Sequence, residues 1–156
     1  MLRDAATEKT WSVQHAYRMA QGLHRLLARV REEIKDANEE LEEAEIARYK
    51  NATDGAWLDE REDYYKALTE SLYLRRRARL IETLFAWWAD VLRARTGLEQ
   101  RELPALKKET KEVAARFSET EIFRRIRRLE ELRDHLGRNI QEALAIEVAF
   151  LKVFGS

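Results

Sequence analysis

Apolar residues recur at alternating steps of three and four along the first part of the chain. Ten consecutive positions follow this pattern: Val13, Ala16, Ala20, Leu23, Leu27, Val30, Ile34, Ala37, Leu41 and Ala44. A heptad spacing of this kind predicts a long helix whose apolar seam faces another helix. We expect the helix to begin near Thr10, a suitable N-cap residue, and to end before the turn residues 51–55.

A second long helix is predicted over residues 59–95. Its later half carries two adjacent apolar stripes, which indicates burial from more than one side. The positions expected in the core of this half are Phe85, Trp87, Trp88 and Leu92. A short turn between two long helices predicts an antiparallel hairpin over residues 10–95, and Gly97 is expected to end the second helix.

Three shorter helices are predicted over residues 104–154, with Ile126, Leu129 and Leu144 in their core. Pro104 suits a first helical position, Ser118 and Glu121 have the spacing of a capping box, and Asn139 is expected to cap a last helix that begins at Ile140. The sequence thus predicts an all-α protein, a bundle of about five helices with a long antiparallel hairpin, in a single domain over residues 1–156.

Composition agrees with long helices and limits the possible chemistry. Ala, Glu, Leu, Lys and Arg make up 92 of the 156 residues, Gly and Pro supply six, and there is no cysteine. The longest uncharged run, residues 10–17, is eight residues, far below the ~18 that a membrane span requires. We therefore expect a cytoplasmic protein with no membrane association.

No motif for catalysis, metal binding or nucleotide binding occurs in the sequence. The five glycines do not match a P-loop, and the three histidines do not form the paired Glu-x-x-His of a di-iron bundle. We expect the histidines at the surface or its rim. The prediction is a non-enzyme with no catalytic residue, no cofactor, no metal and no small-molecule substrate.

Charge is segregated along the chain although 29 basic and 29 acidic residues cancel. Arginines cluster at 75–79 and 124–128, and acidic residues cluster at 39–45. An antiparallel hairpin that turns near residue 54 sets Arg75 and Arg76 opposite Glu33 and Glu32. The first cluster is therefore expected to pair within the chain or to be solvated, while phosphate binding is the alternative.

The last predicted helix is apolar on nearly every side. Eleven of the fifteen residues from Ile140 to Phe154 are apolar, so the domain's own core covers one side and the rest needs a partner. The residues expected at a subunit interface are Glu147, Phe150, Val153, Phe154, Arg124 and Arg128. Glu147 is expected to pair with Arg124, Arg128 or Arg133, or with a neighbouring subunit. Alternatively, the 59–95 helix covers this face and the domain stays monomeric.

Residues 81–97, with Trp88, Asp90, Leu92 and Gly97, resemble a helix ending in W-x-D-x-L…G in bacterial clamp-loader delta-prime subunits of DNA polymerase III. Segments matching in order follow at Phe117–Thr120, Ile126–Leu129, Leu136–Asn139 and Leu144–Glu147. In that family such segments form the C-terminal helical collar, where five subunits join into a ring. The similarity covers residues 70–156. The acidic hairpin is larger than we expect in a minimal collar domain. The nucleotide-binding-type and zinc modules of the family are absent from this sequence.

The resemblance implies a non-catalytic collar domain that assembles with other clamp-loader subunits during DNA replication, without direct nucleic-acid contact. It also implies that the chain is a C-terminal fragment of a longer protein. Two alternatives come from the charge pattern. One is a coiled-coil adaptor that binds a basic helix through the acidic hairpin tip, and the other is a helical nucleic-acid-binding domain that uses the two arginine clusters.

Overall fold

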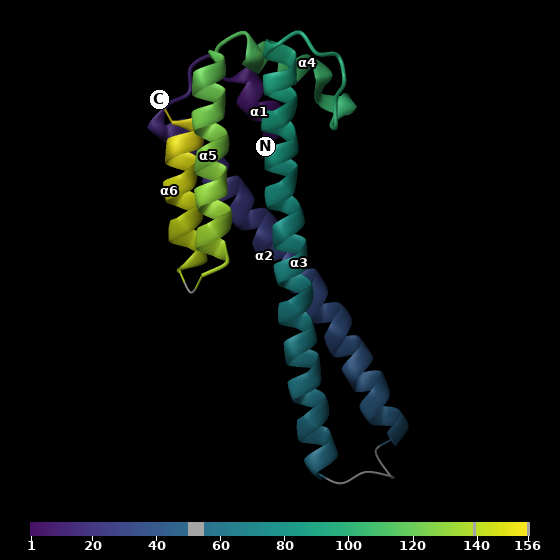
Figure 1. Cartoon of the computed structure of the whole chain (residues 1–156). Helices are drawn as coiled ribbons and strands as arrows, with labels where there is room; N and C mark the ends of the chain where they lie inside the picture. Colours follow the sequence, from purple (N-terminus) through teal and green to yellow (C-terminus); the bar gives the residue numbers. More distant parts are fainter. Residues whose placement is uncertain (50–54, 139, 156) are drawn as a thin grey trace. The chain divides into compact units, whose positions relative to one another are not determined.

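All regular secondary structure in the described residues of the computed structural model is helical (Figure 1). The structure describes residues 1–49, 55–138 and 140–155. The elements are α1 (Leu2–Thr7), α2 (Val13–Tyr49), α3 (Gly55–Arg95), the 3-10 helix η1 (Pro104–Leu106), α4 (Lys107–Ala114), α5 (Glu119–Leu136) and α6 (Glu142–Phe154). The predicted all-α class is confirmed, and α2 and α3 are the two long helices of the predicted hairpin.

The chain divides into two compact units, which we call the bundle unit and the hairpin unit. The bundle unit comprises residues 1–24 and 80–156, and the hairpin unit comprises residues 25–79. Both α2 and α3 run through the two units, so each long helix contributes one part to each. No helix in the described ranges is long and apolar enough to cross a membrane.

In the hairpin unit, α2 and α3 run antiparallel and are joined by polar contacts. The Asn38 side-chain amide donates to Thr69 Oγ1 at 2.7 Å, and the Tyr65 hydroxyl donates to Glu45 Oε2 at 2.8 Å. Residue numbers in these two pairs sum to about 108, which agrees with the predicted register. The Arg31 guanidinium contacts Glu70 at 2.9 Å and lies 3.7 Å from the centre of the Tyr73 ring.

The predicted seam holds from Ala16 to Ile34, but it is wrong at Val13, which is 55% exposed, and in the second half of α2. Leu27 is 2% exposed and Ile34 is half-buried, whereas Leu41 is 57% exposed and Ala37 and Ala44 are also exposed. A straight helix drifts by about 20° per heptad relative to a strict 3.5-residue repeat. After two heptads the predicted face has therefore turned away, and Asn38 and Glu45 occupy the inner positions instead.

The pairing expected for the first arginine cluster is also not formed. Arg75 and Arg76 are exposed, and within the described residues neither makes an ion pair with Glu32 or Glu33. The ion pair that does join the two helices at this level uses Arg31 and Glu70. Arg75 and Arg76 are therefore exposed on α3 without the predicted partners, whereas Arg77 is half-buried and lies 6.0 Å from the centre of the Tyr73 ring.

Aromatic side chains from the segment before α2, from α3 and from α6 form the core of the bundle unit. Trp87 and Trp88 are fully buried, with their ring centres 5.1 Å apart, so the predicted core role of this pair is confirmed. Phe154 lies 5.3 Å from the ring of Trp11 and 6.2 Å from that of Trp88. Aromatic pairs at 4.5–7 Å with tilted rings are favourable beyond the area they bury.

Helix ends follow the local sequence signals at some places and tertiary contacts at others. The capping box at the start of α5 is formed, since Ser118 Oγ accepts from Glu121 N and the Glu121 carboxylate accepts from Ser118 N. Gly97, with φ of 79°, follows the end of α3, and Leu98 N donates to Arg93 O as in a Schellman motif. The backbone of Gly97 is in the left-handed region, where only glycine is unstrained.

Three predicted α-helix starts are wrong. α3 begins at Gly55, inside the predicted turn, rather than at residue 59. α2 begins at Val13 rather than near Thr10, and Ser12 Oγ accepts from His15 N at this end. α6 begins at Glu142 rather than at Ile140, and its N-cap residue is Gln141; the expected cap, Asn139, lies outside the described residues. Pro104 begins a 3-10 turn that leads into α4, rather than the α-helix itself.

Helix α1 was not predicted, because six residues are too few for a helix to be stable alone. Tertiary contacts hold it: Ala5 and Ala6 are buried, and the Trp11 indole donates to Ala5 O at 2.8 Å. The Arg116 guanidinium donates to the carbonyl oxygens of Ala6 and Glu8. Side chains distant in the sequence thus satisfy the carbonyls at the C-terminal end of this helix.

Candidate interaction surface

Three of the residues predicted at a subunit interface are buried inside the bundle unit. Phe150, Val153 and Phe154 are each 0% exposed. The rings of Trp11, Trp87 and Phe150 all lie within 6.2 Å of Phe154. The interface prediction for these residues is therefore wrong, because the segment before α2 and the end of α3 cover the face that the sequence left open.

The arginines predicted as partners of Glu147 within the chain are wrong, while pairing with a neighbouring subunit stays a prediction. Its Oε1 lies 4.0 Å from Nε2 of His24, on α2. The guanidinium of Arg128 pairs instead with Glu131 on the same helix, and that of Arg133 approaches Glu82 at 3.9 Å. The remaining candidate, Arg124, is exposed on α5. Glu147 thus lies at the edge of α6 that faces α2, away from the arginines of α5.

The other predicted core residues divide into three groups. Leu129 is fully buried, while Phe85, Leu92 and Ile126 are half-buried. Leu144 is 53% exposed, so its assignment to the core is wrong. In α6 the core side is provided by Ile146, Phe150 and Val153 instead, which places Leu144 on the opposite side of the helix at 100° per residue.

This opposite side of α6 forms an apolar strip between two charged residues, which we call the α6 outer surface. It consists of Leu144, Glu147, Val148, Leu151 and Lys152. Leu144 and Val148 are 53% and 39% exposed, and Leu151 is half-buried. Helix periodicity places Glu147 along one edge and Lys152 along the other. A helix with a buried face ordinarily has polar residues on its outer side, and α6 does not.

Contacts with α5 hold α6 in place, so the α6 outer surface is presented by a supported helix. α5 and α6 lie side by side (Figure 1). Arg125 Nε donates to Val153 O at 3.1 Å, and its guanidinium lies 3.9 Å from the centre of the Phe117 ring. Burial lowers the pKa of Arg125 from its ordinary value. A cation at this position satisfies a carbonyl in the last turn of α6 and suits the negative end of the helix dipole.

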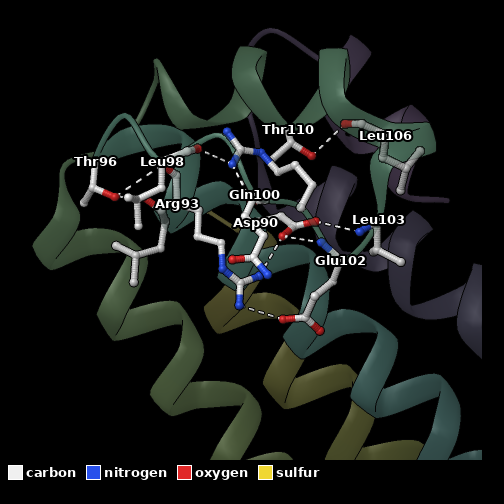
Figure 2. A network of polar contacts seen from close by, with 11 residues as sticks. Asp90, Arg93, Thr96, Leu98, Gln100, Glu102, Leu103, Leu106 and Thr110 are labelled. Carbon is white, nitrogen blue, oxygen red and sulfur yellow. Dashed lines mark hydrogen bonds and ion pairs between the residues drawn. The ribbon is translucent and has the colours of Figure 1, made fainter.

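A buried carboxylate organises the connection between α3 and α4 (Figure 2). Asp90 is 0% exposed and accepts hydrogen bonds from the backbone amides of Glu102 at 3.0 Å and Leu103 at 2.8 Å. Arg93 donates to Asp90 at 2.8 Å and contacts the Glu102 carboxylate at 2.7 Å. Burial raises the pKa of Asp90, but these hydrogen bonds outweigh burial and the pKa lies below its usual value.

The Asp90 network has a structural role, which the sequence reasoning did not assign. All of the charge on Asp90 is compensated by donors from its own chain, and none of these groups is a nucleophile or an activated base. The available signal was an acidic residue two positions after the buried Trp87-Trp88 pair, because a carboxylate on a buried helix face needs several donors.

A groove between α2 and α3 in the hairpin unit is also an internal network of charges. It has a volume of about 470 Å³ and is lined chiefly by charged residues of α2 and α3. Three ion pairs account for most of them: Arg31–Glu70, Lys35–Glu39 and Lys66–Glu62. Across the described residues there is no group of three or more potential metal ligands. The groove therefore lacks the convergent, unpaired polar groups of a ligand site.

The expectation of surface or rim histidines is wrong for His15. Its side chain is 2% exposed and stacks on Trp11 with ring centres 5.9 Å apart. Nδ1 lies 3.7 Å from the Glu8 carboxylate. Burial lowers the pKa of His15, and the nearby carboxylate opposes this only in part. His15 is thus part of the aromatic core of the bundle unit.

Comparison with known proteins leaves the chain without an established relative. No family model matches it, and no curated protein or solved structure shows significant similarity to it.

Proposed function

We propose that this chain is a non-catalytic assembly domain and that it joins a larger complex through the α6 outer surface. One observation carries the proposal: Leu144 and Val148 are exposed on a helix whose other side is fully buried. Burying these side chains against a partner is favourable by about 25 cal/mol for each Å² of apolar area. The surface therefore favours association with another apolar helix or groove.

The outer side of α5 provides the comparison within the same unit. Its exposed positions include Arg124, Arg127, Glu130 and Asp134, as expected for a helix that faces solvent. Phe123, which is 53% exposed, is an isolated exception. The apolar strip on α6 is thus a local feature of one helix and does not reflect a generally apolar surface.

The resemblance of residues 70–156 to the collar of clamp-loader delta-prime subunits suggests the kind of complex. A collar domain joins subunits through helical surfaces and has no catalytic residues, which suits an all-helical unit of this kind. We propose that the partners are other clamp-loader subunits and that the complex acts in DNA replication. Any ATP hydrolysis would belong to those partners.

The test is co-elution of the chain with purified clamp-loader subunits in size-exclusion chromatography. Leu144→Asp should abolish co-elution, because it places a charge in the apolar contact. Val13→Asp is the matched control, since Val13 is 55% exposed at the start of α2 and the change in charge is the same. Absence of a complex with the wild-type chain, or equal binding of both variants, would contradict the proposal.

A second candidate function is binding of a phosphate backbone by the hairpin unit. The exposed arginines there include Arg25 and Arg29 on α2 and Arg75 and Arg76 on α3, and within the described residues none of these four is in an ion pair. Binding of this kind should weaken steeply between ~50 and ~200 mM salt. Fluorescence anisotropy with a labelled duplex at both salt concentrations tests it, with Arg75→Ala and Arg76→Ala as the variants.

The third alternative, an adaptor that binds a basic helix through the acidic tip, stays a prediction. Several of the acidic residues already have partners within the hairpin unit. Glu45 accepts from Tyr65 and approaches Arg61 at 3.8 Å, and Glu39 and Glu62 pair with lysines on their own helices.

A further inference from the structure

We propose that the α6 outer surface binds a second copy of this chain, with the two α6 helices parallel about a two-fold axis. This inference rests on the assembly role proposed for α6, but it does not depend on the clamp-loader resemblance. It names the contact that the α6 outer surface makes when the chain is alone, and the orientation of that contact. The arrangement is isologous, so each copy contributes the same residues.

The residue types along the strip fit a parallel two-stranded contact. Gln141, Leu144, Val148 and Leu151 follow the spacing of consecutive a, d, a and d heptad positions. A β-branched residue at a with leucine at d favours parallel dimers over higher oligomers, and here Val148 is the a residue between two leucines at d. Gln141 has the spacing of the preceding a position and is the N-cap residue of α6, so the apolar part of the seam consists of Leu144, Val148 and Leu151.

The charges at the two edges specify the orientation. In this heptad assignment Glu147 is a g residue and Lys152 is the e residue five positions later. In a parallel pair, the g position of one helix lies next to the e position of the other. The Glu147 carboxylate of each copy therefore lies next to the Lys152 ammonium group of the other copy, which gives two equivalent ion pairs. An antiparallel pair would instead bring the two glutamates together and the two lysines together.

Neither charged residue has a strong competing partner in its own chain. Glu147 Oε1 lies 4.0 Å from His24 Nε2, and Lys152 Nζ lies 3.9 Å from Glu131 Oε2. Both distances exceed the 2.7–2.9 Å of a strong charge-assisted hydrogen bond. Each side chain is partly exposed, at 31% for Glu147 and 46% for Lys152. Both can therefore turn toward a second copy at little cost.

Because α6 is already folded within the bundle unit, a short apolar seam is sufficient for two copies to associate. An isolated helix of 13 residues would be marginal in water, whereas α6 is held by its buried face. Contact through one helix is nevertheless smaller than the ~1,200–2,000 Å² of a standard stable interface. We therefore expect a weak dimer whose population rises with protein concentration.

Sedimentation velocity on the full chain at about 5 to about 500 µM tests the association, a range that spans weak contacts. The wild-type chain and the Val13→Asp control should shift from monomer to dimer as concentration rises. Leu144→Asp and Val148→Asp should remain monomeric, with unchanged circular dichroism because both positions are exposed. A wild-type chain that is monomeric throughout, or folded variants that dimerise like the control, would overturn the proposal.

A charge exchange tests the pairing of Glu147 with the partner's lysine. Glu147→Lys and Lys152→Glu should each weaken the dimer by roughly tenfold, because each places like charges side by side. The double variant should return to within about threefold of the wild type, since it restores both pairs with reversed sign. Two single variants that bind like the wild type, or a double variant as weak as the singles, would overturn this pairing.

Cysteine cross-linking tests the orientation directly, because the natural chain has no cysteine. Gln141→Cys should form a disulfide-linked dimer on mild oxidation, since facing a positions in a parallel pair approach within the ~7 Å that a disulfide allows. In an antiparallel pair centred on Val148 the two positions would be about 20 Å apart along the axis. Val13→Cys is the control, and cross-linking of the control to the same extent would contradict the parallel contact.

These outcomes are independent of the clamp-loader test. A chain that stays monomeric alone but joins clamp-loader subunits would overturn the homodimer and keep the assembly role. A chain that dimerises through α6 but joins none of those subunits would keep the homodimer and overturn the clamp-loader role.

Discussion

The bundle unit and the hairpin unit share two long helices, but their interiors differ in kind. In the described residues, the only buried apolar side chains of the hairpin unit are Leu27 and Tyr73; all the others lie in the bundle unit. The interior of the hairpin unit includes the Asn38–Thr69 hydrogen bond and the Arg31 guanidinium on Tyr73. The bundle unit instead buries a cluster of tryptophan and phenylalanine rings.

This difference shows how the same helix can be stabilised in two ways along its length. Apolar burial contributes most of the favourable free energy of folding, so the bundle unit should dominate the stability of the chain. The hairpin unit depends on few buried residues, and exposed ion pairs add only about 0–1 kcal/mol each. Substitutions in the two units should therefore differ in the size of their effects.

The largest effect is expected from the aromatic core of the bundle unit. Trp88→Ala should lower the free energy of unfolding by about 3–5 kcal/mol, because it leaves a large cavity among the other rings. Trp88→Phe is the control and should cost much less, since its indole nitrogen has no hydrogen-bond partner in the described structure. Urea unfolding followed by circular dichroism measures both; equal losses would indicate that ring packing is not the main contribution.

The next largest effect separates the inner and outer positions of α2 in the hairpin unit. Leu27→Ala should cost about 2–4 kcal/mol, whereas Leu41→Ala should change stability by no more than about 0.5 kcal/mol. The first side chain is 2% exposed and the second is 57% exposed. Chemical denaturation of the two variants compares them. A similar loss in both would favour the strict heptad seam over the observed 3.6-residue periodicity.

A smaller effect is expected at the Asp90 network of the bundle unit. Asp90→Asn should cost about 1–3 kcal/mol near pH 7, because buried amide and guanidinium donors lose a charged acceptor. The pKa of Asp90 is lowered on folding, so its contribution is present above the unfolded pKa of about 3.9. It is lost as pH falls through the lower folded pKa.

Unfolding experiments from pH 7 to pH 2 on wild type and Asp90→Asn check this dependence. The difference between the two proteins should shrink as pH falls below about 4. Asp134→Asn, at an exposed position of α5, is the control and should stay within about 0.5 kcal/mol of wild type. A difference that does not change with pH would mean that the charge of Asp90 is not what stabilises the connection.

The smallest effect concerns the polar contact inside the hairpin unit. Thr69→Val should cost about 1 kcal/mol, because it removes the acceptor of the Asn38 amide, which is buried at 5% exposure. Combining it with Asn38→Leu should recover part of this loss, since both partners are then apolar. Thermal unfolding of the two single variants and the double variant measures the coupling, and strictly additive losses would argue against a direct interaction.

Several features of the fold follow from the sequence because they depend on local chemistry. The capping box at Ser118 and the left-handed glycine at position 97 need only neighbouring residues to form. The lengths of α2 and α3 follow from apolar periodicity and from the scarcity of glycine and proline. The burial of Trp87 and Trp88 follows from two adjacent apolar stripes on one helix. These predictions concern segments in which capping residues and apolar spacing favour the same helical structure.

Tertiary structure alone decided which side of each helix is covered. Sequence showed that α6 is apolar nearly all round, but the choice between Phe154 inside and Leu144 outside depends on Trp11 and the end of α3 packing against one face. Helix α1 likewise exists because Trp11 and Arg116 bind its carbonyls. Local preferences determine where helices form, whereas competition among apolar faces for burial determines which residues are left for a partner.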